Sequence, residues 1–185
     1  MSFCLAEKHE PKVTVERLQE FKGNDLNDLC DSLEKTLADS SAGLSMGLSW
    51  LKAPSRERIE SYYKGIVLIP ERNFYVGRLD GVIASTVQLV KPSKTNQAQS
   101  FAASIREHFV APWARGHGLA KMLIEAAETE CKFLGLKVLK LEVRANQEAA
   151  ISLYESYGFK RWGTLDKYEM VDGQYVAGHF YYKDI

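Results

Sequence analysis

Two glycines and an alanine alternate where an amphipathic helix begins, at Gly116, Gly118 and Ala120. The first turn of a helix presents unpaired N–H groups and the positive end of the helix dipole. Residues with little or no side chain leave those N–H groups open to a bulky anion such as a phosphate ester. The pattern therefore predicts a phosphate-binding loop. The alternative for a short glycine motif is a tight turn that allows close helix packing.

The spacing of these residues narrows the kind of phosphate ligand. A P-loop has the pattern G-x-x-x-x-G-K-[ST], but no hydroxyl residue follows Lys121. The dinucleotide-binding pattern G-x-G-x-x-G also fails, because Lys121 occupies the position of its last glycine. Both nucleotide-binding classes are therefore disfavoured.

The sequence R-G-H-G-L-A resembles the pyrophosphate loop of the GNAT superfamily of acetyl-CoA-dependent N-acyltransferases. The signature of that loop is [QR]-x-x-G-x-[GA], which Arg115, Gly118 and Ala120 match. The stretch LEVRANQEAAISLYESYGF (141–159) resembles the second motif of the family, which comprises a strand, a short helix with a tyrosine and then G-F. Within it, LEVRA, AAI, LYES and GF are most similar to the branch that acetylates protein N-termini, including that of a ribosomal protein. The resemblance extends over about residues 104–159.

The resemblance implies an α/β (α+β) GNAT fold, with a mixed central sheet, a splayed strand pair and flanking helices. It also implies one domain over residues 1–185. In this family the pantetheine arm of acetyl-CoA lies between the splayed strands and bonds to main chain, and the glycine loop holds the pyrophosphate. By position, the cofactor-binding residues would be His108, Phe109, Val110, Arg115, Gly116, His117, Gly118, Leu119, Ala120, Lys121, Asn146 and Gln147.

The amide side chains before the motif tyrosine depart from the family pattern. The family often has asparagine seven positions before that tyrosine, where this sequence has Gln147, with Asn146 one step earlier. Either amide is a candidate for orienting the cofactor. Both are also candidates for the start of the following helix, and Asn146 is the better N-cap by residue type.

Amide formation from a thioester requires a neutral amine, stabilisation of an oxyanion and a proton for the departing thiolate. The resemblance assigns the proton donor to Tyr154 in the LYE motif and the proton acceptor to Glu142. A phenol with a reference pKa of about 10 can protonate a thiolate of similar basicity. Glu107, on the strand before the loop, is a competing base, and His108 and His117 also have a suitable pKa. The alternatives are a core tyrosine, paired surface glutamates and a His117 ring that faces solvent.

Two classes of function follow from these residues. The first is an acetyltransferase that acts on a primary amine, and the second is a catalytically silent acyl-CoA-binding or regulatory domain. Tyr154 favours the first class. No motif in the expected acceptor-binding segments identifies the amine, so a protein N-terminus, a small amine metabolite and an amine antibiotic all remain open.

Composition limits the partners and the cellular location. The chain of 185 residues carries 24 basic and 24 acidic side chains and is 45% hydrophobic, which suits one domain with a core. Nucleic acid is disfavoured, because duplex binding needs about 6 to 10 Lys or Arg contacts and the sequence has no such basic block. We expect acetyl-CoA and an amine as partners, and either a monomer or a homodimer.

The cysteines and the N-terminus indicate the compartment. Cys4, Cys30 and Cys131 are far apart, odd in number and outside any C-x-x-C or histidine-rich segment, so neither a disulfide framework nor a metal site is predicted. The sequence has no apolar run of about 18 residues and no signal-peptide core at its start. A cytoplasmic protein without a membrane-spanning segment is therefore expected.

Hydrophobic periodicity and turn residues predict the elements that position the site. Strands are expected at 12–18 and 104–112, and helices at 25–40, at 55–68 and from about Gly118 to Glu130. The resemblance implies a further strand within 141–145 and a short helix around Tyr154. Hairpins are expected at 73–90 and 169–185, with their turns at Asp80-Gly81 and Asp172-Gly173. Polar connections are expected at 40–55, where the chain would close over the substrate, and at 91–100. Asn24 and Asp25 are candidates for the cap of the first helix.

Overall fold

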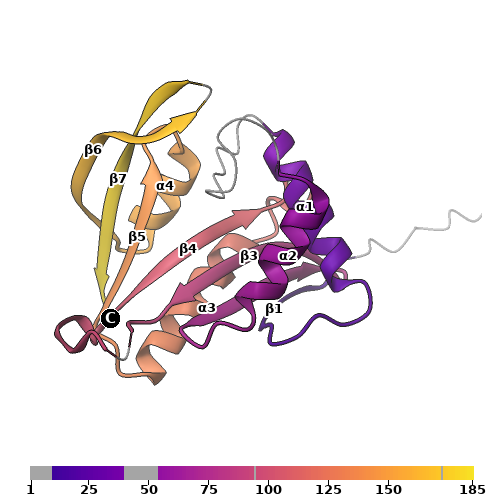
Figure 1. The fold of residues 1–185 in the computed structure, drawn as a ribbon, viewed down its shortest axis with the longest axis horizontal. Helices are drawn as coiled ribbons and strands as arrows, with labels where there is room; N and C mark the ends of the chain where they lie inside the picture. The colour runs from indigo at the N-terminus through magenta and orange to yellow at the C-terminus, as the bar shows by residue number, and fades with distance from the viewer. Residues whose placement is uncertain (1–9, 40–53, 94, 172) are drawn as a thin grey trace, which may run out of the picture.

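A computed structural model describes residues 10–39, 54–93, 95–171 and 173–185. These residues contain a seven-stranded sheet in the order β1-β2-β3-β4-β5-β7-β6, in which β4 and β5 are parallel and the other neighbours are antiparallel (Figure 1). The strands are β1 (Val13–Arg17), β2 (Arg72–Leu79), β3 (Val82–Val90), β4 (Ala102–Val110), β5 (Val138–Arg144), β6 (Lys160–Val171) and β7 (Gln174–Asp184). The helices are α1 (Asp25–Ala38), α2 (Arg56–Ile66), α3 (Leu119–Phe133) and α4 (Glu148–Ser156), with short 3-10 turns at Gln97–Gln99 and Pro112–Ala114. The predicted mixed α/β architecture is confirmed.

Helices pack on both faces of the sheet. On one face, α3 buries Leu123 and Ala127 in a cluster that includes Leu139 of β5. On the other face, Leu29 of α1 and Ile59 of α2 are fully buried in a second cluster with residues of β2 and β3. The helical periodicity read from the sequence therefore marks the buried sides of these helices.

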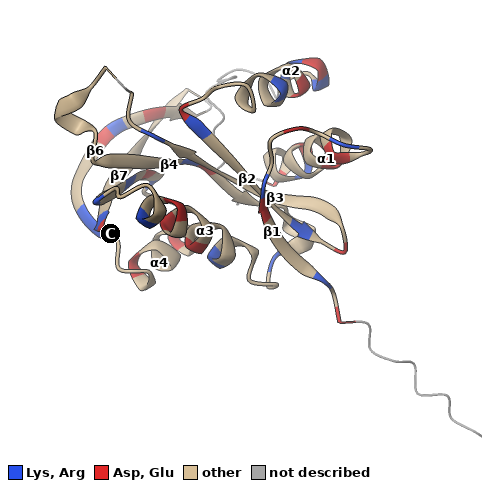
Figure 2. Ribbon diagram, turned by 90° about the horizontal axis from the view of Figure 1, so that it is seen from below, with Lys and Arg blue, Asp and Glu red and all other residues tan. Residues whose placement is uncertain are grey.

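Basic and acidic residues both lie along α1, α2 and α3 (Figure 2). Several join separate elements. Arg56 of α2 lies 2.6 Å from the Asp31 carboxylate of α1, and Arg78 of β2 lies 2.7 Å from Asp25 at the start of α1. These ion pairs help to orient α1 against its neighbours.

Both predicted hairpins are confirmed, but Asp172 of the second predicted turn lies outside the described residues. Asp80 and Gly81 have φ of 50° and 86°, the left-handed values that a tight two-residue turn requires. The second hairpin joins β6 to β7, but β6 begins at Lys160, well before the predicted start at Glu169. Its side chains are mostly exposed or partly exposed, so the strand lacks the alternation of buried and exposed residues that would identify it from sequence.

The helix boundaries differ slightly from those expected. The first helix ends at Ala38, the second spans Arg56–Ile66, and the N-cap of α1 is Asn24. Most of the predicted loop that would close over the substrate, residues 40–53, lies outside the described residues. The predicted polar connection at 91–100 contains one of the 3-10 turns.

Strands β4 and β5 separate soon after they pair. Their parallel ladder runs from Ala102 with Val138 to Ser104 with Lys140. Beyond it, β4 continues along β3 while β5 continues along β7. We call the opening between β4 and β5 beyond Ser104 and Lys140 the fork, which is visible in Figure 1. The expected splayed strand pair is therefore confirmed.

A β-bulge in β4 lies beside the fork. Between Arg106 and Phe109, two residues of β4, Glu107 and His108, oppose a single residue of β3. Glu107 has φ of 47°, a left-handed value that is uncommon for a residue with a side chain. As a result, Glu107 contacts α2 on one face of the sheet and His108 contacts α3 on the other.

Gly77 of β2 allows the start of α3 to approach the sheet. A Cβ at Gly77 would lie 2.7 Å from Leu119 Cδ2 and closer still to Ser85 Oγ. We predict that Gly77→Ala lowers the free energy of unfolding by about 1–3 kcal/mol, because overpacking displaces buried groups. Denaturant unfolding measures this change.

Gly65 in α2 provides the control, because a Cβ there would meet no atom of the described structure within 4 Å. Gly65→Ala should raise the free energy of unfolding by about 0.5–1 kcal/mol, since alanine favours a helix. An unfolding midpoint for Gly77→Ala equal to that of the wild type would contradict the close approach of α3.

Candidate active site

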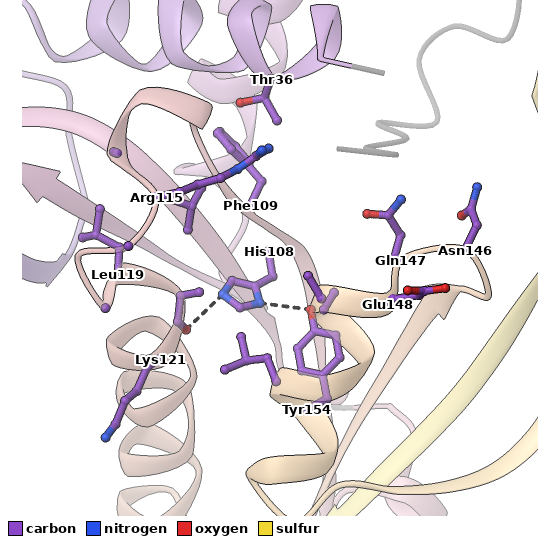
Figure 3. Close-up of a pocket in the computed structure, with 18 residues that line it drawn as sticks. Thr36, His108, Phe109, Arg115, Leu119, Lys121, Asn146, Gln147, Glu148 and Tyr154 are labelled. Carbon is purple, nitrogen blue, oxygen red and sulfur yellow. Dashed lines mark hydrogen bonds between the residues drawn. The ribbon is translucent and has the colours of Figure 1, made fainter. Parts of the chain in front are cut away.

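A cavity of about 640 Å³ lies at the fork, between the end of β4 with the start of α3 and the start of α4 (Figure 3). All the residues that the sequence assigned to the cofactor line it except His117, and Tyr154 lines it as well. The lining also includes residues that were not predicted, namely Thr36, Ala114, Glu148, Ala149, Ala150 and Leu153. The two sequence motifs therefore face one space.

The glycine loop has the backbone of a tight turn and an open side. Gly116 and Gly118 have φ of 83° and 79°, and Gly118 is the N-cap of α3. A Cβ at either position would meet no described atom within 4 Å. The turn alone therefore accounts for glycine here, and the open space beside it faces the positive end of the α3 dipole.

Basic side chains flank this loop. Arg115 and Lys121 both line the cavity. The Arg115 guanidinium lies 2.8 Å from the Asp39 carboxylate, which connects the loop to the end of α1. His117 is exposed, with its Nδ1 3.3 Å from the Ala114 carbonyl oxygen, and it does not line the cavity.

Tyr154 of α4 reaches the cavity wall from the face that α3 covers. Its hydroxyl lies 3.0 Å from His108 Nδ1, and His108 Nε2 lies 3.1 Å from the Ala120 carbonyl oxygen (Figure 3). Burial raises the pKa of the Tyr154 phenol above its ordinary value. Burial also lowers the pKa of His108 to about 4, in spite of the hydrogen bond to Ala120. Both side chains are therefore neutral at physiological pH.

Glu107 lies on the opposite face of the sheet, among polar groups of α2 and β3. Gln88 Nε2 donates to Glu107 Oε2 at 2.6 Å, and the Tyr62 hydroxyl donates to Oε1. Arg72 in turn donates to the Gln88 amide oxygen. Burial raises the pKa of the Glu107 carboxyl to about 8. This carboxylate is a stronger base than an ordinary glutamate, with a pKa suited to proton transfer near neutral pH.

Glu142 of β5 lies on the same face as Glu107, but it has a charged hydrogen-bond partner. Its two carboxylate oxygens accept hydrogen bonds from Arg106 of β4 at 3.0 and 3.1 Å, and the Tyr168 hydroxyl donates to one of them at 3.1 Å. Neither Glu107 nor Glu142 lines the cavity. The Glu142 carboxylate is thus held in an ion pair that crosses the fork.

Several site features were not found by sequence reasoning. Tyr62 and Gln88 belong to no recognised motif, and only the folded chain brings them to Glu107. The N-cap of α4 is Gln147, so the prediction of Asn146 as the cap was wrong. The Gln147 side chain makes no cap hydrogen bond within the described chain, and both amides line the cavity instead.

The described residues were also searched for metal and membrane features. No cluster of three or more His, Cys, Asp and Glu side chains in residues 10–39, 54–93, 95–171 and 173–185 could hold a metal ion. No helix in that part of the chain is long and apolar enough to cross a membrane. Cys30 and Cys131 are buried free thiols, and Cys4 lies outside the described residues.

Comparison with known proteins gives the family. The model of the Acetyltransferase (GNAT) family matches residues 37–159. An uncharacterized N-acetyltransferase in the hisH-hisA intergenic region of Azospirillum brasilense is 50% identical over 135 residues, 73% of this chain and 77% of that protein. The ribosomal protein bS18-alanine N-acetyltransferase of Salmonella typhimurium is 48% identical over 50 residues, 27% of this chain and 34% of that protein.

A solved structure shows the likeness of the whole fold. The ribosomal L7/L12 alpha-N-protein acetyltransferase RimL, in complex with coenzyme A, superposes with a TM-score of 0.76 at 16% identity, over 94% of each chain. Its fold, the two sequence motifs and the family match over residues 37–159 all agree. The chain belongs to the GNAT family of acetyltransferases.

Proposed function

We propose that the protein, as one catalytic domain over residues 1–185, transfers the acetyl group of acetyl-CoA to a primary amine by direct attack in a ternary complex. The observation that carries this proposal is the cavity at the fork, which brings the glycine loop and the buried Tyr154 hydroxyl to one space. Membership of the GNAT family supports acetyl-CoA as the acyl donor. The complex of RimL with coenzyme A supports coenzyme A binding in this fold.

The pantetheine arm would lie in the fork. Beyond Ser104, β4 pairs with β3 on one edge, and its other edge faces the opening. Main-chain groups of His108, Phe109 and Val110 on that edge would hydrogen-bond to the arm, because an unpaired strand edge offers free N–H and C=O groups. The pyrophosphate would lie at residues 115–121, and Asn146 and Gln147 would orient the arm from the other wall.

Each proton in the reaction has a proposed donor and acceptor. Glu107 takes a proton from the ammonium group of the acceptor, and the neutral nitrogen attacks the thioester carbonyl carbon to form the C–N bond. The tetrahedral oxyanion then collapses, the C–S bond breaks, and the departing thiolate takes the hydroxyl proton of Tyr154. The phenolate regains a proton from solvent after the products leave. The nitrogen bonded to the acetyl group releases its second proton to water as the oxyanion collapses, and Glu107 later releases its proton to solvent. The steps therefore balance to one amide, one CoA thiol and one released proton for each ammonium group consumed.

The contacts of the two glutamates favour Glu107 over Glu142, the residue that the sequence resemblance assigned, as the base. Glu107 has neutral partners, and its pKa of about 8 allows it to accept a proton near neutral pH. Glu142 is paired with Arg106, and taking a proton would break that ion pair. We therefore propose that Glu142 holds Arg106 in place across the fork and does not itself accept the proton.

The acceptor is proposed to be a primary amine of a small molecule or of a peptide or protein N-terminus. The similarity to the ribosomal protein bS18-alanine N-acetyltransferase supports the second option. Release of CoA thiol from acetyl-CoA with a panel of amines and peptides, followed by mass spectrometry of the products, tests the proposal. Thermal protection by acetyl-CoA without thiol release for any acceptor would indicate an acyl-CoA-binding domain instead.

The glycine loop can be tested with a substitution that fills its open side. We predict that Gly118→Trp abolishes acetyl-CoA binding in calorimetry, because the indole would occupy the space expected for the pyrophosphate. Arg115→Ala should be milder and lose about 1–3 kcal/mol of binding free energy, as for one charge-assisted hydrogen bond.

Gly135→Trp is a matched control at the other end of α3. Gly118 and Gly135 have φ of 79° and 69°, and both have open space beside them, so a side chain imposes similar backbone strain at either position. Gly135 does not line the cavity. Wild-type affinity in a folded Gly118→Trp variant would show that the loop does not hold the anion.

Tyr154→Phe tests the proton donor. The ring would still pack, so acetyl-CoA affinity should stay nearly intact while kcat falls by about 10²- to 10⁴-fold, the usual contribution of a positioned general acid. Tyr181→Phe is the matched control, because it removes a hydroxyl that donates to Glu155 at 2.8 Å outside the cavity. A loss below about threefold with chemistry rate-limiting would remove Tyr154 from this role.

The pH dependence of kcat tests the base. A carboxyl with a pKa of about 8 must be deprotonated to act, so the wild-type kcat should fall as the pH decreases below that value. We predict that Glu107→Gln lowers kcat at neutral pH by about 10²- to 10⁴-fold and removes this inflection. A higher pH should partly restore the rate, because solution then supplies the neutral amine.

Glu142→Gln serves as the comparison, since it alters a carboxylate on the same face of the fork. It should retain the inflection near pH 8, because Glu107 is unchanged. An inflection that persists in Glu107→Gln and disappears in Glu142→Gln would instead assign the base to Glu142.

A further inference from the structure

We propose that His108 is a positioning residue for Tyr154. Its Nδ1 accepts a hydrogen bond from the Tyr154 hydroxyl, while its Nε2 donates a hydrogen bond to the Ala120 carbonyl oxygen, which holds the ring in place. This inference rests on the proposed role of Tyr154 as the proton donor. The two contacts measure 3.0 Å and 3.1 Å, and they join β4 to α4 on one side and to the first turn of α3 on the other (Figure 3).

The partners of the ring determine where its hydrogen lies. A carbonyl oxygen only accepts hydrogen bonds, so His108 Nε2 carries the hydrogen that is donated to Ala120. Burial lowers the pKa of His108 to about 4, so the ring is neutral and has a single N–H. Nδ1 is therefore an acceptor, and the Tyr154 O–H must donate to it.

This arrangement directs the phenol hydrogen toward Nδ1 before the reaction begins. Because the Tyr154 hydroxyl donates its hydrogen to Nδ1, the lone pairs of its oxygen stay free and its position is fixed. His108 cannot replace Tyr154 as the acid, because Nδ1 has no proton to give. When the C–S bond breaks, the hydroxyl turns from Nδ1 to the thiolate and gives up its proton there. The ring remains neutral throughout.

The same ring connects the hydroxyl to the cofactor loop. Ala120 belongs to the first turn of α3, directly after Gly118 and Leu119, and all of these residues line the cavity. His108 thus fixes the position of the Tyr154 hydroxyl relative to the turn of α3 at which a pyrophosphate would bind. We infer that the ring sets the position of the phenol oxygen relative to a cofactor that α3 holds.

Two amide substitutions separate the two ring nitrogens. An asparagine amide occupies about the position of histidine Nδ1, and a glutamine amide occupies about the position of Nε2, while each amide supplies both an acceptor and a donor. His108→Asn therefore keeps a partner for Tyr154 and loses the bond to Ala120. His108→Gln keeps a partner for Ala120 and loses the acceptor for Tyr154.

We expect His108→Gln to lower kcat at least about tenfold, with the KM for acetyl-CoA changed less than about twofold. His108→Asn loses the bond to Ala120 but keeps a partner for the phenol, so it should lower kcat clearly less than His108→Gln does. In His108→Gln, the further change Tyr154→Phe should cost much less than it does in the wild type, because the two residues act as a unit. The reverse order, with Gln active and Asn impaired, would overturn the proposal and leave His108 as a tie between β4 and α3.

Equal losses in the Asn and Gln variants would also overturn it. If Tyr154→Phe causes a large loss of kcat and His108→Gln causes none, only this inference fails. If Tyr154→Phe itself causes no loss, the proton donor in the proposed function fails first. These two failures are therefore distinguishable.

A measurement on the wild-type protein does not depend on the folding of any variant. Nitrogen NMR of ¹⁵N-histidine-labelled protein at neutral pH should show, for His108, a protonated Nε2 and an unprotonated Nδ1. The spectrum of a folded His108→Asn protein or the nuclear contacts of the ring assign the signal. The opposite tautomer, or a charged ring at neutral pH, would overturn the proposal.

Discussion

The left-handed backbone at Glu107 is the constraint on which the rest of the site depends. A residue with a side chain at φ of 47° costs about 1–3 kcal/mol, and surrounding contacts must hold it there. The Thr86 hydroxyl donates to the Glu107 carbonyl oxygen at 3.1 Å, and Gln88 donates to its carboxylate at 2.6 Å. The bulge interrupts the strand alternation between Arg106 and Glu107, so Glu107 shares the face of Arg106 and His108 lies on the face of α3. Without it, strand alternation would place Glu107 on the face of Ile105, in the core beneath α3.

The fork divides the sheet, and a side-chain contact crosses it on each face. On the face of α2, Arg106 of β4 pairs with Glu142 of β5 at 3.0 Å. On the face of α3, His108 of β4 meets Tyr154 of α4 at 3.0 Å. The main-chain ladder between the two parts ends at Ser104 with Lys140, so these contacts fix the width of the opening where hydrogen bonds between strands no longer do. The proposed pantetheine arm would use that width, with the Tyr154 hydroxyl at one wall of the cavity.

Features that depend on local sequence were predictable. The Asp80-Gly81 turn and the glycine loop before α3 require a left-handed backbone, and their residue types predict that conformation. The bulge was not predictable, because Glu107 is not a glycine and its conformation follows from the register of β4 against β3. The contacts of the His108 side chain were not predictable for the same reason. Its main chain could be placed from the motif, whereas its ring contacts with Ala120 and Tyr154 exist only after α3 and α4 have packed.

The two glutamates on one face of the fork show how environment can separate the roles of identical side chains. Glu142 has Arg106 as a counter-ion, while the partners of the Glu107 carboxylate within the described residues are the neutral groups of Tyr62 and Gln88. Burial raises the folded-state pKa of Glu107 to about 8, above the value of about 4.3 for an unfolded glutamate.

The folded state therefore binds this proton more tightly than the unfolded chain does. The stability that the protonated carboxyl contributes is fully present below about pH 4 and is lost progressively up to about pH 8, where the charged form dominates in both states. At neutral pH a carboxyl with a pKa of about 8 is mostly protonated, so most of this stability is still present and only the deprotonated minority can take a proton from the acceptor. The proposed chemistry uses that minority, and its share increases as the pH rises toward 8, at the expense of the stability that the protonated form contributes.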